Sequence, residues 1–154
     1  MSVTLKHVKA EHKKLGALIA TLEAAAASQA SASVYRIAEA TIDLASGERY
    51  AGMVLRADGT PSHHLVLLPG QADSVNWDDA KRWAAEAGGE LPTRQEQALL
   101  YANLKGSFAA AWYWSGEEHT DGSYAWTQYF SYGYQGYYHK SYEGRARAVR
   151  RLDA

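Results

Sequence analysis

An aromatic stretch runs from Trp112 to Arg151 and holds three of the five tryptophans and eight of the eleven tyrosines of the chain. Gly, Ser, Asp and His are interleaved among these rings, and a continuous buried strand would not need them. Tyr offers a broad contact face with a polar tip, and only two side-chain torsions are frozen when it binds. The mixture is typical of a binding surface carried on short strands and turns.

Composition limits the classes of partner. The charges of sixteen basic and seventeen acidic residues nearly cancel, so the net charge of the chain does not favour nucleic acid or anionic lipid as a partner. The chain has no cysteine, which excludes disulfides, thiol nucleophiles and Cys-ligated metals and favours a reducing compartment or a virus particle. No segment approaches the roughly 20 apolar residues of a bilayer span, and no secretory signal is recognised. We expect a protein made in the cytosol without a membrane partner, and leave virion association open.

A narrow apolar stripe predicts a helix over residues 3–28. Besides Ala26, it has six large residues, Leu5, Val8, Leu15, Leu18, Ile19 and Leu22, with heptad spacing from Val8 to Leu15 to Leu22. The helix either packs on its own domain or acts as an oligomerisation arm. In the second case these six residues would form the contact with another copy. A low-complexity run at 24–33 follows, which places a domain boundary near residue 32 and divides the chain into 1–32 and 33–154.

The middle of the chain combines strand and helix signals. Three antiparallel strands are expected within residues 34–44, 49–57 and 63–70, separated by Ser-Gly and Asp-Gly turns. Asn76 is placed to cap one helix, and Thr93, followed by Glu96, to cap a second. His63 and His64 are adjacent in a strand and point to opposite faces, which disfavours a shared metal ion.

The last third returns to strands at 112–115 and 124–130, followed by a glycine-broken loop or ragged strand at 131–144 and a closing strand at 146–152. Trp126, Gln128 and Phe130 should share one face of their strand. The closing arginines form a local basic set, but they alternate with Ala and Val as in a strand. Nucleic acid therefore remains disfavoured as a partner.

This order of elements resembles a known family. The pieces are GGELPTRQEQALL, WYWSGEE, SYAWTQYF and RARAVRRL, with the most specific matches at Leu91–Arg94, Trp114–Ser115, Ala125–Trp126 and Arg147–Arg150. Over about residues 35–152 they resemble the C-type-lectin-like domains of bacteria and phages that are related to the Legionella collagen-like adhesin C-terminal domain and to formylglycine-generating enzyme. Some members are phage receptor-binding proteins diversified by retroelements. Whether this chain is diversified in that way stays open.

The resemblance implies an α+β, C-type-lectin-like fold in which two helices brace short antiparallel strands, with the N-terminal helix as an added arm. It further implies that Trp114, Trp126 and Phe130 are core, and that Lys140, Arg145 and Arg147 have structural partners. The implied ligand-binding surface consists of His119, Asp121, Ser123, Tyr124, Tyr132, Tyr134, Tyr137, Tyr138, His139 and Tyr142. Without cysteine the oxygenase chemistry of formylglycine-generating enzyme is not carried over, and no carboxylate–amide calcium motif is present. No cofactor and no metal are expected.

These observations favour a non-enzymatic binding module, encoded by a phage or prophage, that presents a Tyr-rich surface to a protein or glycan receptor. An alternative is a phage inhibitor that occludes a host protein such as a defence complex. An enzyme is less favoured because no motif unites the histidines with a nucleophile. A purely structural alternative is that the tyrosines pack in the interior, since Tyr also favours strands.

Overall fold

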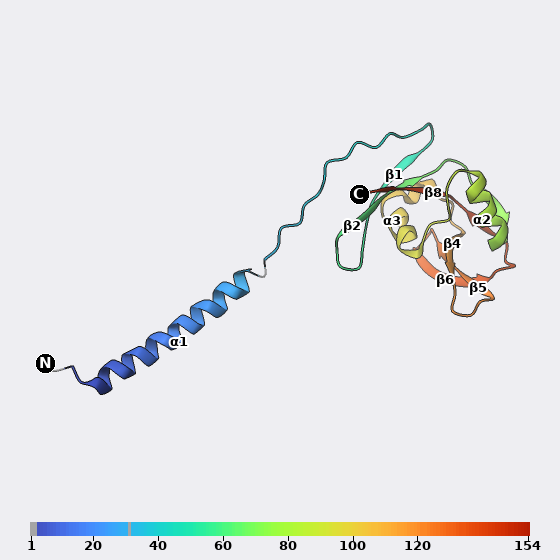
Figure 1. Cartoon of the computed structure of the whole chain (residues 1–154). Coiled ribbons are helices and arrows are strands. Elements are labelled where there is room, and N and C mark those ends of the chain that lie inside the picture. Colours follow the sequence, from blue (N-terminus) through green and yellow to red (C-terminus); the bar gives the residue numbers. More distant parts are fainter. Residues whose placement is uncertain (1–2, 31) are drawn as a thin grey trace. The chain divides into compact units, whose positions relative to one another are not determined.

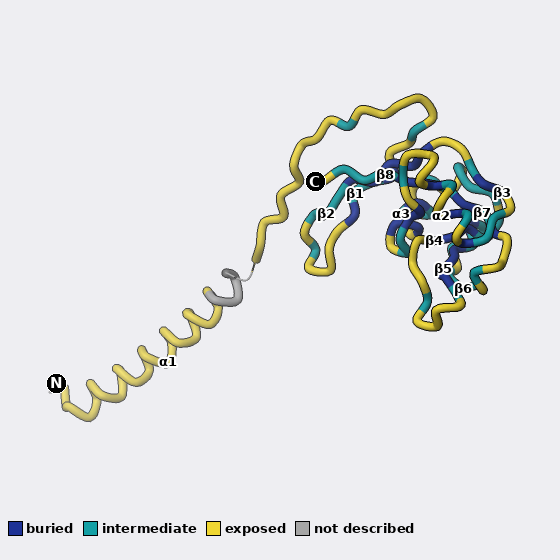
Figure 2. Tube along the Cα trace, turned by 45° about the vertical axis from the view of Figure 1, so that its right-hand side comes forward, coloured by how far each residue is buried: buried dark blue, intermediate teal, exposed yellow. Residues whose placement is uncertain are grey.

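The computed structural model describes residues 3–30 and 32–154 and is of the mixed α+β type (Figure 1). The chain divides into two compact units, Met1–Glu39 and Ala40–Ala154. Burial is concentrated in the second unit, where the dark blue segments of Figure 2 lie. None of the described helices is long and apolar enough to cross a membrane.

The first unit contains the helix α1, Leu5–Ala30, which confirms the helix expected at 3–28. Its sequence is rich in Ala, Leu and Lys and contains no Pro, so helix propensity is high. The hydroxyl of Thr4 accepts a hydrogen bond from the backbone N–H of His7 at 3.3 Å and caps the start. All six residues of the apolar stripe are exposed, from 46% at Ile19 to 70% at Leu5.

The prediction of a strand at residues 34–44 is wrong. Residues 32–45 form no strand or helix, and Val34 and Ile37 remain 79% and 77% exposed. The sequence has the alternation of a strand here, but no neighbouring strand pairs with it. An extended segment gains its stability from a partner ladder, so the pattern alone is insufficient.

The second unit contains two sheets. The smaller is antiparallel, with the order β1-β2-β8, and consists of β1 Arg49–Leu55, β2 Pro61–Leu67 and β8 Val149–Asp153. The larger has the order β3-β7-β4-β5-β6 and consists of β3 Ala72–Val75, β7 Gly144–Ala146, β4 Trp112–Glu118, β5 Tyr124–Tyr129 and β6 Tyr134–His139. Its pairings are antiparallel except for β4 with β7.

The closing segment differs from the single strand expected at 146–152. It forms β7 and β8, which belong to different sheets, and Arg147 makes the crossing between them. The Arg147 guanidinium donates to the carbonyl oxygens of Ser107 at 2.5 Å and Leu68 at 2.9 Å. These bonds hold the crossover in place and confirm the structural role expected for this arginine.

Two helices pack on the sheets as the sequence predicted. α2, Trp77–Glu86, begins after Asn76, whose side chain accepts from the N–H of Asp79 at 2.9 Å. α3, Arg94–Leu104, begins after Thr93, whose hydroxyl accepts from the N–H of Glu96 at 3.1 Å, and a 3-10 turn, Lys105–Ser107, follows it. Both caps satisfy N–H groups that a helix start leaves without partners.

The core forms two clusters, one on each side of the larger sheet. The first gathers the buried side of α2 with Leu68, Leu91 and Trp114. The second gathers α3 residue Leu100 with Leu65, Tyr113 and Phe130. Trp114 and Phe130 are 0% and 2% exposed, which confirms them as core.

Candidate functional site

Strands β5 and β6 pair over six residues without a bulge, and one face of this ribbon carries a row of rings. Tyr124 lies opposite His139, and Trp126 lies opposite Tyr137. The row, here called the aromatic strip, consists of His119, Tyr124, Trp126, Tyr137 and His139. Its rings meet edge to face or tilted at centroid distances of 4.2–6.3 Å. Such contacts hold the rings in fixed positions while Tyr137 stays 51% exposed.

The turn between β4 and β5 positions His119 over this strip. The His119 imidazole accepts from the N–H of Asp121 at 3.0 Å, and the Asp121 carboxylate accepts from the N–H of Ser123 at 3.1 Å. The predicted site residues Asp121 and Ser123 thus build the turn. The His119 ring is left 4.2 Å from the ring of Tyr137.

The other face of the same ribbon carries the predicted site residue Tyr138, and the predicted site residue Tyr142, in the turn after β6, packs against it. Their rings stack at 4.2 Å, and Tyr138 also contacts Trp112 edge to face at 5.3 Å. Tyr138 packs against the first core cluster. The ten predicted residues are therefore divided between the two faces of the ribbon and the three turns around it, and they do not lie on one face.

The turn between β5 and β6 exposes Tyr132 and Tyr134, at 69% and 65%. Gly133 between them has a φ of 78°, which favours glycine. Within the segment 131–144, which was expected as a loop or ragged strand, Tyr134–His139 form the regular strand β6, and turns flank this strand on both sides. Gly136 in β6 lies beside the ring of Trp112. A Cβ atom at position 136 would meet that indole ring at 3.5 Å.

Trp126 was expected in the core and is instead half-buried at the surface. It shares a face with Gln128 and Phe130, as the alternation predicted, but those two residues are buried, at 1% and 2% exposure, and Trp126 is not. Over Trp126 lies the guanidinium of Arg94, whose central carbon is 3.5 Å from the ring centroid. This cation–π contact takes the place of core packing.

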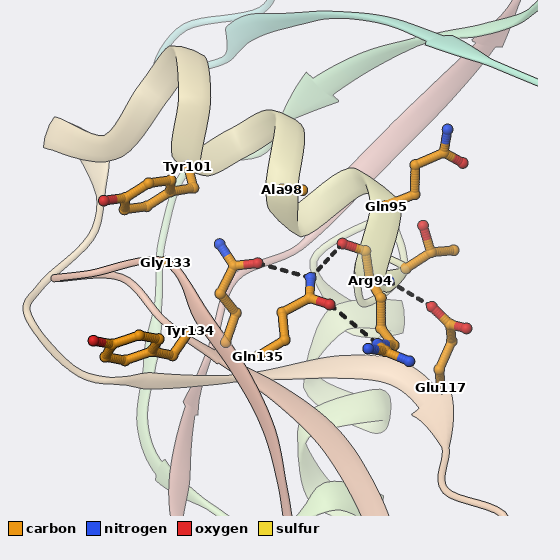
Figure 3. A pocket seen from close by; sticks show the side chains of 10 residues that line it. Arg94, Gln95, Ala98, Tyr101, Glu117, Gly133, Tyr134 and Gln135 are labelled. Carbon is orange, nitrogen blue, oxygen red and sulfur yellow. Dashed lines mark hydrogen bonds between the residues drawn. The ribbon is translucent and has the colours of Figure 1, made fainter. Parts of the chain in front are cut away.

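A chain of side-chain amides links Arg94 to the interior (Figure 3). Arg94 Nε donates to Gln135 Oε1 at 3.1 Å, and Gln135 Nε2 donates to the Arg94 carbonyl at 2.7 Å and to Gln128 Oε1 at 2.9 Å. Gln128, which is 1% exposed, donates to the carbonyl of Gln97 at 3.0 Å. Because the chain ends on buried groups, the orientation of the Arg94 side chain is set from within the fold.

An open groove of about 870 Å³ lies beside this amide chain, between α3 and the start of β6 (Figure 3). Its lining consists of Thr93, Arg94, Gln95, Ala98, Tyr101, Glu117, Gln128, Gly133, Tyr134 and Gln135. One carboxylate oxygen of Glu117 accepts from the backbone N–H of Arg94 at 2.5 Å. The groove therefore combines a guanidinium, a carboxylate, amides and two tyrosines.

No family model matches the chain, and a search of curated proteins finds no match. Among the described side chains, no group of three or more His, Asp or Glu is arranged to hold a metal ion.

The basic residues of the last strands have structural partners. Lys140 pairs with Glu118 at 2.9 Å and Arg145 with Asp73 at 3.3 Å, as expected. The two closing arginines also pair with carboxylates, Arg150 with Glu48 and Arg151 with Glu90 and Glu96. His63 and His64 diverge as predicted, His64 toward the hydroxyl of Tyr50 at 2.9 Å and His63 toward Glu96.

Sequence reasoning missed the groove residues Arg94, Gln128 and Gln135 as site residues. One signal was available for Arg94. It occupies the first position of α3, where the helix dipole disfavours a positive charge. A cation placed there against the dipole indicates a role other than helix formation.

Proposed function

We propose that this chain is a non-enzymatic binding module that uses the aromatic strip and the adjoining groove to hold a protein or glycan receptor. The observation that carries the proposal is the fixed, partly exposed arrangement of five rings on the β5–β6 ribbon beside a groove lined with polar groups. Exposed aromatic clusters of this kind mark interaction sites more often than isolated surface rings do. A purely structural role would not require Tyr137 to be half exposed.

Binding would proceed by loss of water from the rings against the partner. An aromatic side chain buries roughly 150–250 Å² when it is fully covered, so a few rings can account for most of the affinity. The rings already contact one another, so little side-chain entropy remains to be lost. His119 and His139 at the edge of the strip supply hydrogen-bonding groups for specificity.

The resemblance to C-type-lectin-like domains of phages supports a receptor-binding role. The architecture of the second unit, with the helices α2 and α3 and two sheets of mainly antiparallel strands, is compatible with that resemblance. The same surface would also serve a phage inhibitor of a host protein, and the target distinguishes the two roles.

We also propose that α1 makes the module oligomeric. An isolated helix has little stability of its own and normally gains it by packing an apolar face. The stripe from Leu5 to Leu22 repeats with heptad spacing, which suits a second copy of the same helix. Linking several modules would raise avidity without any new contact at the site.

The test compares adsorption of the labelled full chain to a panel of bacterial cells and its binding to their soluble lysates. Tyr137→Ser combined with His119→Ser should weaken binding about tenfold or more, because it removes two neighbouring rings of the strip. Tyr35→Ser is a matched control, since Tyr35 is 52% exposed and lies outside the domain that carries the site. Equal binding by the double variant and the control would contradict the proposal. Retention by lysate alone would favour the inhibitor role.

A further inference from the structure

We propose that the groove beside α3 binds a saccharide that carries a carboxylate, with Arg94 as the group that holds the carboxylate. The inference rests on the proposed function and names the ligand class for one part of that surface. It is carried by the arrangement of Arg94, Glu117 and the two tyrosines that line the groove.

The two terminal nitrogens of the Arg94 guanidinium are available to donate hydrogen bonds to a ligand. One face of its guanidinium lies over Trp126, and its Nε is occupied by Gln135. Within the part of the chain that the structure describes, its two terminal nitrogens make no hydrogen bond and no carboxylate lies within 4.0 Å of them. Arg145, Arg150 and Arg151 all have carboxylate partners. The terminal nitrogens of Arg94 are thus left for an acceptor from outside.

The orientation of these nitrogens is fixed before any ligand arrives. Gln135 bonds both the side chain and the backbone carbonyl of Arg94, and it is itself held by the buried Gln128. A planar guanidinium held in this way presents two parallel N–H groups, which match the two oxygens of a carboxylate. A lysine could supply the positive charge but not the two parallel N–H donors.

The other groove residues favour a sugar over an acidic peptide. Glu117 lines the same groove, and its second oxygen has no hydrogen-bond partner among the described residues. That oxygen would repel any acidic group beyond the one that Arg94 neutralises, so it disfavours a run of acidic side chains, but it would accept readily from hydroxyl groups. Tyr101 and Tyr134 add flat apolar faces with polar tips at the other end of the groove (Figure 3). A hydroxylated ring with one carboxylate satisfies all three kinds of group.

The groove also has a suitable size. Small-molecule sites commonly measure about 300–1,000 Å³, and this one measures about 870 Å³. The absence of a side chain at Gly133 lets the β5–β6 turn approach Tyr101 at one wall of the groove, because a Cβ atom at this position would lie 2.8 Å from the Tyr101 ring.

The experiment is saturation-transfer NMR on the full chain with D-glucuronate as the probe and D-glucose as the neutral comparison. We expect transfer to the ring protons of glucuronate and much less to glucose. Arg94→Gln should weaken glucuronate binding on the order of tenfold or more, as loss of a charge-assisted bidentate bond does. Arg94→Lys, which keeps the charge but not the two parallel donors, should fall between the two. Arg82→Gln on α2 is the control, because Arg82 pairs with Asp79 away from the groove.

Near-ultraviolet circular dichroism of each variant shows whether the fold is kept, and Arg94→Lys provides the readout if Arg94→Gln does not fold. Absence of glucuronate binding, or equal binding of glucose, overturns the inference. Arg94-dependent binding of a tri-glutamate peptide in preference to glucuronate also overturns it and assigns the groove to an acidic protein segment. None of these outcomes removes the ring-dependent binding tested by Tyr137→Ser and His119→Ser, so the two proposals fail separately.

Discussion

Both carboxylate oxygens of Glu96 accept hydrogen bonds from Nε of Arg151, at 3.0 and 3.1 Å, and so tie the first turn of α3 to β8. Glu96 is only 1% exposed, whereas Glu90, which pairs with the same arginine, is 71% exposed. A buried carboxylate depends on its partner far more than an exposed one does, because water cannot replace the lost bonds.

Glu96→Gln should therefore lower the free energy of unfolding by about 1.5–3 kcal/mol, the range for hydrogen bonds to charged groups. Glu90→Gln is the matched control and should cost about 0–1 kcal/mol, as exposed ion pairs do. Urea unfolding of both variants measures the difference. Equal losses would show that burial of Glu96 does not strengthen its bonds to Arg151.

Local signals in the sequence were enough to predict α2 and α3. Asn76 and Thr93 cap these helices through hydrogen bonds to residues three positions on, so the information lies within one turn. The apolar alternation at 34–44 carried no such information about a partner strand, and that prediction was wrong. The short strand β3 was missed because its four residues, ADSV, have almost no apolar pattern.

The candidate site was harder to predict because it depends on register. Trp126 and Tyr137 meet only because β5 and β6 pair as they do, and a shift by one residue would exchange the two faces. Alternation placed Trp126 on the same face as Phe130 but could not show which part of α3 lies above Trp126. Arg94, 32 positions before Trp126 in the printed sequence, covers the ring through a contact that no local pattern specifies.

Gly133 offers a test of the close approach between the β5–β6 turn and α3. Gly133→Ala meets two penalties: a φ of 78°, and a Cβ atom 2.8 Å from the ring of Tyr101. Gly59 has a similar φ of 85° but open space around it. Gly59→Ala should cost about 1–2 kcal/mol from the backbone alone, and Gly133→Ala should cost more.

Thermal or urea unfolding gives both values. Combining Gly133→Ala with Tyr101→Ala should recover part of the excess loss, because the ring that the Cβ atom meets is gone. If the two glycine variants are equally stable, Tyr101 does not constrain the turn.

Glu48 makes the stability of the fold depend on pH. The side-chain hydrogen bond from Arg150, and then the bond from the backbone N–H of Ala45, hold the pKa of this carboxyl below its ordinary value of 4.5. A carboxyl with a lowered folded-state pKa contributes stability above its unfolded pKa and loses it as the pH falls through the folded value. Wild type should exceed Glu48→Gln in stability at neutral pH, and the gap should close progressively below about pH 4.5.

Chemical unfolding at several pH values measures this gap. Arg150→Gln is the informative companion, because with Arg150 absent the Glu48→Gln substitution should have a smaller and less pH-dependent effect. A gap that stays constant down to strongly acidic pH would contradict the assigned role of Arg150.

The apolar stripe of α1 is exposed to solvent in the single chain. If a second copy covers it, Leu15→Glu with Leu22→Glu places two charges in the helix interface and should convert the chain to a monomer, since unpaired buried charges are strongly unfavourable. Ala10→Glu with Ala17→Glu is the matched control: it adds the same charge to the same helix, but at heptad positions opposite the stripe. Sedimentation equilibrium gives the mass of each. Wild type and the control should share one oligomeric mass, and a monomeric wild type would refute self-association through α1 while leaving the ligand site on the other unit untouched.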